Sequence, residues 1–241
     1  MYFVAHRGLH SSTITENSIE AIELGSKVKY LDGVEFDVRL SKDNKVVVIH
    51  DKTIDRVSNG VGTVANMTLR QLRKYNYGSD IAPSTISTLD EVLDVITPNS
   101  LLIIELKDED KRNSILVTEV LKILDKYPNL NIWLKSFSSQ IVALLQNSSK
   151  YPVGILVDKT STKELLKDTY FYSISKHVIN KTIVKDLIKR DKVIMIWTVD
   201  TKEELSNLKK TLGEYIDDIY IISNNPLSLL EKNSNLKANI L

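Results

Sequence analysis

Residues 101–107 read Leu-Leu-Ile-Ile-Glu-Leu-Lys, an apolar run that ends in two charged side chains. Runs that are apolar almost throughout are typical of a parallel sheet covered by helices, whereas alternating polar residues mark a half-exposed antiparallel strand. Residues two positions apart in a strand point to the same face, so Glu105 and Lys107 share one side. This stretch predicts a buried strand that presents a carboxylate and an ammonium group at its carboxyl end.

Seven further short runs rich in Val, Ile, Leu and Tyr occur along the chain, and helical periodicity separates most of them. These predicted strands are Tyr2–His6, Val34–Leu40, Ile132–Phe137, Val153–Val157, Phe171–Ser175, Val193–Val199 and Ile219–Ser223. The predicted helix faces are Leu89–Ile96, Val117–Leu124, Ile141–Leu145, Ile183–Ile188 and Leu205–Leu212. Asn17, followed by Glu20, is expected to cap a first helix. This alternation predicts an α/β fold, a TIM (β/α)₈ barrel, with a doubly wound open sheet as the alternative.

The connection between Leu40 and Leu89 is irregular. It contains an apolar run, a turn signal and a short helical segment, namely Val46–Ile49, Asn59-Gly60 and Leu69–Leu72. We interpret it as a small inserted subdomain after the second strand, at about residues 51–87, beside the barrel mouth. The length would also fit two small domains, but no linker or repeat divides the chain, so residues 1–241 are predicted to form one domain.

Charge balance and the absence of cysteine exclude several kinds of protein. Basic residues number 32 against 31 acidic ones, a net charge of +1, so no overall charge draws the chain to nucleic acid. Zero cysteines exclude disulfides, Cys-ligated zinc, iron–sulfur clusters and thiol nucleophiles. No apolar stretch approaches the roughly 20 residues of a membrane span. Because Tyr2–His6 reads as a strand rather than as a secretory signal, the sequence predicts a cytoplasmic protein.

Paired carboxylates mark a candidate metal site. Glu35 and Asp37 lie two residues apart in a predicted strand, so both can point to one face. The carboxyl ends of TIM-barrel strands open on one mouth, where Glu105 can join them, although each pair alone also fits a solvated strand end or an ion pair. Three carboxylates without Cys or paired His ligands favour one divalent cation held by oxygen, Mg²⁺ or Ca²⁺, with zinc as a weaker alternative.

Two of the four histidines follow apolar runs in comparable settings. His6 ends the first predicted strand, and His50 follows Val46–Ile49. Imidazole is the commonest proton-transfer group near neutral pH, although a lone histidine is more often structural. Arg7 offers a forked donor for phosphate oxygens, or else a salt bridge at the barrel rim. With the three carboxylates, one divalent cation, Arg7 and Lys107, the site would carry one net positive charge, which a phosphodiester monoanion would neutralise.

The order of these motifs resembles that of the glycerophosphodiester phosphodiesterase family. The motifs that carry the resemblance are His6-Arg7-Gly8, Glu16-Asn17, Glu35-x-Asp37, His50-Asp51-x-Thr53-x-Asp55-Arg56, Asn59-Gly60-x-Gly62, Thr88-Leu89-Asp90-Glu91, Glu105-x-Lys107, Ser136-Phe137 and Trp197-Thr198-Val199. The resemblance covers nearly the whole chain. It implies a TIM barrel with a small inserted subdomain, Mg²⁺ or Ca²⁺, and hydrolysis of a small glycerophosphodiester to glycerol 3-phosphate and an alcohol.

Residue roles follow from the resemblance by matched position. It implies metal ligation by Glu35, Asp37 and Glu105, acid–base catalysis by His6 and His50, and phosphate binding by Arg7 and Lys107. Trp197 would cover the glycerol moiety, or else belong to the core. The nucleophile would be water or the 2-hydroxyl of the substrate's own glycerol. Nothing in the sequence points to an oligomeric state.

Two other functions remain alternatives at this point. One is a related phospholipase D acting on lysophospholipids or sphingomyelin, against which the inserted segment and the missing cysteines argue. The other is a non-catalytic barrel that binds a phosphorylated ligand, against which the retained histidines and carboxylates argue. The chain departs from the family at Ser223-Asn224-Asn225-Pro226, where Thr-Asp or Thr-Asn often precedes the closing proline, so the role of this loop is open.

Overall fold

Nine strands form one sheet in the computed structural model of the chain, which describes residues 1–96, 98 and 100–230. The strands are β1 Tyr2–His6, β2 Gly33–Leu40, β3 Val46–Val48, β4 Leu101–Leu106, β5 Asn131–Ser136, β6 Val153–Val157, β7 Phe171–Ser175, β8 Val193–Trp197 and β9 Tyr220–Ser223. Their order is β1-β9-β8-β7-β6-β5-β4-β2-β3, and β1 also pairs with β2. This last pairing closes eight parallel strands into the predicted TIM barrel and rules out the open sheet.

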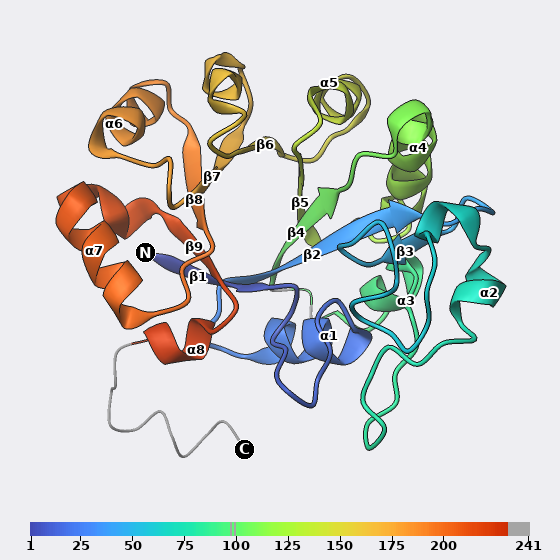
Figure 1. The fold of residues 1–241 in the computed structure, drawn as a ribbon. Helices are drawn as coiled ribbons and strands as arrows, with labels where there is room; N and C mark the ends of the chain where they lie inside the picture. Colours follow the sequence, from blue (N-terminus) through green and yellow to red (C-terminus); the bar gives the residue numbers. More distant parts are fainter. Residues whose placement is uncertain (97, 99, 231–241) are drawn as a thin grey trace.

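Helices surround the closed sheet (Figure 1). The α-helices around the barrel are α1 Ile19–Lys27, α3 Leu89–Leu93, α4 Asn113–Leu124, α5 Ser139–Ser148, α6 Lys181–Lys189, α7 Lys202–Leu212 and α8 Pro226–Leu229. The 3₁₀ turns in these connections are η2 Asp110–Arg112, η3 Thr162–Leu166 and η4 Gly213–Asp218. Apolar side chains recur every three or four residues on the longer helices, as in α4, where Leu116, Val120 and Leu124 are buried against the core. The core therefore lies between the strands and the ring of helices.

The cap expected at Asn17 is wrong. Helix α1 begins at Ile19 with Ser18 as its N-cap, and the Ser18 side chain accepts a bond from the backbone nitrogen of Ala21. Asn17 instead has a left-handed backbone with φ of 57°. Its amide side chain is directed into the barrel mouth, where it contacts Asp37.

The predicted insertion leaves the barrel through β3, which pairs antiparallel with β2. Residues beyond β3 form the 3₁₀ turn η1 Val64–Asn66 and helix α2 Leu69–Leu72, which lie outside the ring of helices (Figure 1). Its apolar side chains form a separate cluster of Val47, Ile49, Ile54, Val64, Leu72, Tyr77 and Ile86. This small core holds the segment together beside the carboxyl end of β2.

The fold does not test two of the predictions made from the sequence, the bounds of the domain and the cellular location. The predicted single domain, residues 1–241, includes positions 97, 99 and 231–241, which lie outside the described residues. Within the described ranges, no helix combines the length and the apolar character needed to cross a membrane. A cytoplasmic location stays a prediction.

Candidate active site

Four neighbouring strands bring the charged residues together. Pairing of β1, β2, β4 and β5 is in parallel register, with His6 opposite Glu35, Asp37 opposite Glu105, and Glu105 opposite Lys135. His6, Glu105 and Lys135 lie at or near the carboxyl ends of their strands, which open on one mouth of a TIM barrel, and the register brings Glu35 and Asp37 of the longer strand β2 level with them. Residues remote in sequence thus meet on one side of the mouth.

Three carboxylates form the centre of the site. The exposed fractions of Glu35, Asp37 and Glu105 are 0%, 1% and 4%, and one oxygen from each lies within 4.8 Å of the others. Glu35 Oε1 and Asp37 Oδ1 are buried, and among the described residues their close polar contacts are ion pairs with lysines rather than well-aligned hydrogen bonds. Because three buried carboxylates repel one another and hard divalent cations take oxygen ligands, this group could hold a divalent cation.

Two buried lysines flank the carboxylates. Lys107 Nζ lies 2.9 Å from Asp37 Oδ1 and also donates to Glu105. Lys135 Nζ lies 3.0 Å from Glu35 Oε1, and Lys135 is only 2% exposed. Sequence reasoning missed Lys135, whose signal was a single lysine inside an apolar strand. Three carboxylates and two ammonium groups leave one net negative charge.

Burial and ion pairing oppose each other in this cluster. Burial alone would lower the pKa of Lys107, but Asp37 and Glu105 raise it above its ordinary value. Burial would raise the pKa of Asp37, but Lys107 and the nearby His50 and Arg7 hold it well below its usual range. Burial raises the pKa of Glu105 despite Lys107. The two carboxylates on neighbouring strands therefore differ in proton affinity.

Arg7 and Gly8 turn the chain away from β1 in the left-handed region, with φ of 57° and 84°. This turn directs the Arg7 backbone nitrogen to Glu35 Oε2 at 3.2 Å. The guanidinium donates to Glu16 Oε1 at 2.8 Å, and its Nε, which has no hydrogen-bond partner in the described part of the chain, lies 3.5 Å from Asp37 Oδ2. Arg7 is therefore already compensated by Glu16, so the site's net charge depends on the two lysines.

Asn17 fixes the orientation of Asp37. Its Nδ2 donates to Asp37 Oδ2 at 2.9 Å, and its Oδ1 accepts from the Asp37 backbone nitrogen at 3.1 Å. Both groups of the amide are thus used on one residue, and Asn17 is 5% exposed. This contact explains why Asn17 is not available to cap α1.

His6 lies at the end of β1 with its two ring nitrogens in different surroundings. Nδ1 is 2.7 Å from Asn224 Oδ1, and Nε2 is 3.9 Å from Glu35 Oε2. Burial lowers the pKa of His6, although Glu35 acts in the opposite direction. The structure thus brings His6 to the carboxylates, as the sequence predicted.

His50 lies between the barrel and the inserted segment. Its Nδ1 is 2.7 Å from Asp51 Oδ1, and Asp51 Oδ2 accepts from Arg56 Nε at 2.6 Å. Arg56 also donates to both oxygens of Glu16. Burial lowers the pKa of His50, while Asp37 raises it. A chain of ion pairs therefore ties His50 to the loop that follows β1.

Trp197 ends β8, where its indole Nε1 donates to the backbone oxygen of Ser173 at 2.9 Å. Its ring meets Phe137 edge to face, with centroids 5.7 Å apart and planes at 86°. Phe137 follows β5 and is 39% exposed. An aromatic pair thus stands at the carboxyl ends of β5 and β8.

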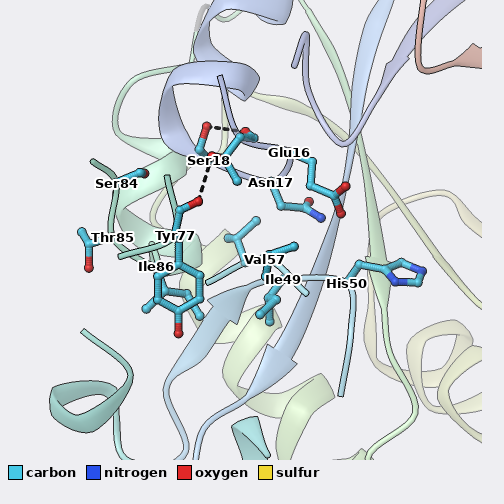
Figure 2. Close-up of a pocket in the computed structure, with 12 residues that line it drawn as sticks. Glu16, Asn17, Ser18, Ile49, His50, Val57, Tyr77, Ser84, Thr85 and Ile86 are labelled. Atoms are coloured by element: carbon cyan, nitrogen blue, oxygen red, sulfur yellow. Dashed lines mark hydrogen bonds between the residues drawn. The ribbon is translucent and has the colours of Figure 1, made fainter. Parts of the chain in front are cut away.

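Two hollows border the inserted segment. A cavity of about 20 Å³, room for about one water, lies between residues 15–18 and the insertion (Figure 2). Tyr77 packs in the insertion core, and its hydroxyl points away from Glu16 and His50 in this view. Beside it, an open groove of about 480 Å³ is lined mainly by polar side chains, including His10, Glu16 and Arg56. The groove adjoins the ion-pair chain of His50.

Comparison with known proteins identifies the family. The model of the glycerophosphoryl diester phosphodiesterase family matches residues 6–216. The chain belongs to this family. A Bacillus subtilis relative, provisionally named a glycerophosphodiester phosphodiesterase, is 30% identical and covers 87% of this chain and 90% of its own. The glycerophosphodiester phosphodiesterase of Caldanaerobacter subterraneus is 29% identical, with coverage of 86% and 89%.

A solved structure shows the same fold. An Oleispira antarctica phosphodiesterase, in complex with the product sn-glycerol-3-phosphate, superposes with a TM-score of 0.84 at 22% identity and covers 95% of both chains. The matching glycerophosphoryl diester phosphodiesterase family and its named relatives identify the chain as an enzyme that hydrolyses glycerophosphodiesters.

Proposed function

We propose that the chain hydrolyses glycerophosphodiesters to glycerol 3-phosphate and an alcohol by divalent-cation-dependent, two-histidine catalysis. The observation that carries the proposal is the buried cluster of three carboxylates, with His6 beside Glu35 and His50 near Asp37. The proposed ligands are Glu35, Asp37 and Glu105, the proposed acid–base groups are His6 and His50, and the proposed substrate contacts are Arg7, Lys107 and Trp197.

Charge supports a phosphodiester substrate. The cluster of three carboxylates and two lysines carries one net negative charge, which a divalent cation would convert into one net positive charge. A phosphodiester monoanion would then neutralise the site. When bound, Mg²⁺ or Ca²⁺ would supply charge stabilisation for the phosphate oxygens.

The histidines divide the proton transfers. One imidazole accepts the proton of the nucleophile, which is water or the substrate's 2-hydroxyl, and the other gives a proton to the leaving alcohol oxygen. Burial lowers the pKa of both histidines, which favours the neutral ring that accepts the proton of the nucleophile, while the ring that protonates the leaving oxygen does so from its imidazolium form. Asp51 orients His50 through Nδ1, which leaves Nε2 available for the reaction.

The remaining parts of the substrate fit two neighbouring features. The aromatic pair of Trp197 and Phe137 offers an apolar wall for the glycerol carbons, and the relative solved with sn-glycerol-3-phosphate supports a glycerol subsite. The open polar groove beside Glu16 and Arg56 offers room for the departing alcohol.

The test is release of glycerol 3-phosphate from glycerophosphocholine and glycerophosphoethanolamine, with Mg²⁺, with Ca²⁺ and with a chelator. We expect release that the chelator abolishes, and loss of at least about a hundredfold in kcat for His6→Ala and for His50→Ala. His177→Ala removes an exposed histidine and serves as the control. Activity that survives chelation would refute the metal role, and full activity in either variant would refute the acid–base pair.

A further inference from the structure

We infer that Asp200 and Asn224 are positioning residues that fix the tautomer of His6, with the proton on Nδ1 and the lone pair of Nε2 facing the carboxylates. The inference rests on the proposed role of His6 in proton transfer. It also gives a role to the loop after β9, which the sequence left open.

The first step is the orientation of the Asn224 amide. Asp200 Oδ1 accepts from the Asn224 backbone nitrogen at 2.7 Å, and Asp200 Oδ2 lies 2.9 Å from Asn224 Nδ2. A carboxylate only accepts hydrogen bonds, so the NH₂ end of the amide faces Asp200. The Ser223 hydroxyl, 3.3 Å from Asp200 Oδ1, adds a further contact in the same loop. The opposite end of the amide, Oδ1, therefore faces the barrel mouth.

The second step is the polarity of the bond to His6. Asn224 Oδ1 has no hydrogen and lies 2.7 Å from His6 Nδ1, so Nδ1 must be the donor. His10 Nε2 approaches the same oxygen at 3.3 Å and must donate as well. An amide oxygen has two lone pairs, which matches these two donors. The position of the His6 proton is thus fixed by a chain of contacts from Asp200 through Asn224 to His6, which we call the relay.

The third step is the state of the other ring nitrogen. A neutral imidazole with a proton on Nδ1 has a lone pair on Nε2, and His6 Nε2 lies 3.9 Å from Glu35 Oε2. Without the relay, either tautomer is open to the ring, and the Nε2–H form cannot accept a proton from that side. Asn224 contacts His6 and Asp200 contacts Asn224, so both act through the orientation and tautomer of the ring.

The direct test is the nitrogen spectrum of the histidines in the full-length, Mg²⁺-containing protein. With ¹⁵N-labelled histidine at pH 8, we expect His6 to show a protonated Nδ1 and an unprotonated Nε2, with the signal assigned by its loss in His6→Gln. Four histidines in the chain make the assignment tractable. A protonated Nε2 in the wild-type protein would overturn the inference without any variant being needed.

A single substitution and the exchange of the two residues form a matched pair of variants. Asp200→Asn removes the group that orients the amide, so we expect mixed tautomers of His6 and a fall in kcat of at least about tenfold with KM little changed. The double variant Asp200→Asn with Asn224→Asp restores an acceptor toward His6 and a donor behind it. We expect it to recover the wild-type tautomer and most of the lost kcat.

The two readouts separate this inference from the proposed function. If Asp200→Asn leaves the His6 nitrogen signals unchanged, the relay is wrong, whatever the activity of His6→Ala. If the signals change while kcat does not, the relay exists but His6 has no part in proton transfer, and the positioning role falls with it. Rescue of both signals and kcat by the exchanged pair supports the inference.

Discussion

Lys135 Nζ lies 3.0 Å from Glu35 Oε1, and both side chains are almost completely buried. A buried carboxylate without a partner would destabilise the fold, so this lysine neutralises Glu35 in the absence of any other cation. The same lysine lowers the attraction of the cluster for a divalent cation. Lys135 therefore stabilises the metal-free protein and at the same time weakens its binding of a divalent cation.

Lys135→Met tests both effects. The cluster then carries two net negative charges, and a unit charge at 4 Å is worth about 4 kcal/mol at an effective dielectric constant of 20, so we expect cation binding at least about tenfold tighter. The metal-free variant loses about 3–5 kcal/mol of unfolding free energy, because one buried partner is removed. Titration calorimetry with Mg²⁺ or Ca²⁺ and urea unfolding in chelator measure the two effects. Lys150→Met, which breaks an exposed pair, is the control, and weaker cation binding in Lys135→Met would contradict the prediction.

Asp51→Asn separates the orientation of His50 from metal binding. The carboxylate that accepts from His50 Nδ1 is lost, so we expect kcat to fall by about tenfold to a hundredfold. Calorimetry should show unchanged cation affinity, since Asp51 lies outside the carboxylate cluster. Asp55→Asn is a matched control, because its carboxylate accepts from the Gly62 backbone in the same segment and, within the described residues, not from a histidine. Equal loss of activity in both variants would argue against a specific role for Asp51.

The lowered pKa of Glu16 predicts that the free energy of unfolding depends on pH. Burial would raise the pKa of Glu16, but Arg56 and Arg7 lower it to about 2 from 4.5. A carboxyl group with a lowered folded-state pKa stabilises the fold above its unfolded value, and this stabilisation is lost as pH falls from 4.5 through 2. We expect Glu16→Gln to cost up to about 3 kcal/mol at pH 6.

Urea unfolding at pH 6, 4 and 3 measures the effect of Glu16. The difference between the wild type and Glu16→Gln should shrink as the pH falls. Glu214→Gln removes an exposed carboxylate and controls for the loss of one negative charge. A difference that stays constant across this range would mean that the ion pairs with Arg7 and Arg56 add nothing.

Gly8→Ala tests the turn that presents Arg7. A Cβ at Gly8 would lie 2.6 Å from the backbone carbon of Ala21, and its φ of +84° is unfavourable for alanine. We expect a loss of about 2–4 kcal/mol of unfolding free energy and reduced kcat, because helix α1 or the turn must shift. Gly213→Ala shares the positive φ but meets only Lys181 Nζ at 4.0 Å, so about 1 kcal/mol is expected there. Equal losses in the two variants would exclude the close contact as the cause.

The barrel could be predicted from the sequence because its strands are buried on both faces. The predicted runs Val153–Val157 and Phe171–Ser175 have the same bounds as strands β6 and β7. Glu35, Asp37 and Glu105 were also found, because strand geometry places alternate residues on one face and a barrel gathers strand ends. The apolar pattern of the strands and the geometry of a closed parallel sheet were sufficient to predict both the barrel and the grouping of the three carboxylates.

Other parts of the site depend on contacts that no local pattern encodes. Lys135 was missed because one lysine near a strand end is ordinarily solvated, and only its register with Glu105 brings it to Glu35. The predicted helix cap at Asn17 failed because its amide binds Asp37, 20 positions away. The contact between His6 and Asn224 spans 218 positions and exists only when β1 pairs with β9.

The order of the strands has a consequence for synthesis on the ribosome. All five charged residues of the cluster lie in or next to β2, β4 and β5, whereas β9, which pairs with β1, begins at Tyr220. The nascent chain therefore carries the complete set of charges while the β1 and β5 edges are still open. A chain that stops after β5 would keep two unpaired strand edges, so we expect premature termination products to associate with one another rather than to remain as stable half-barrels.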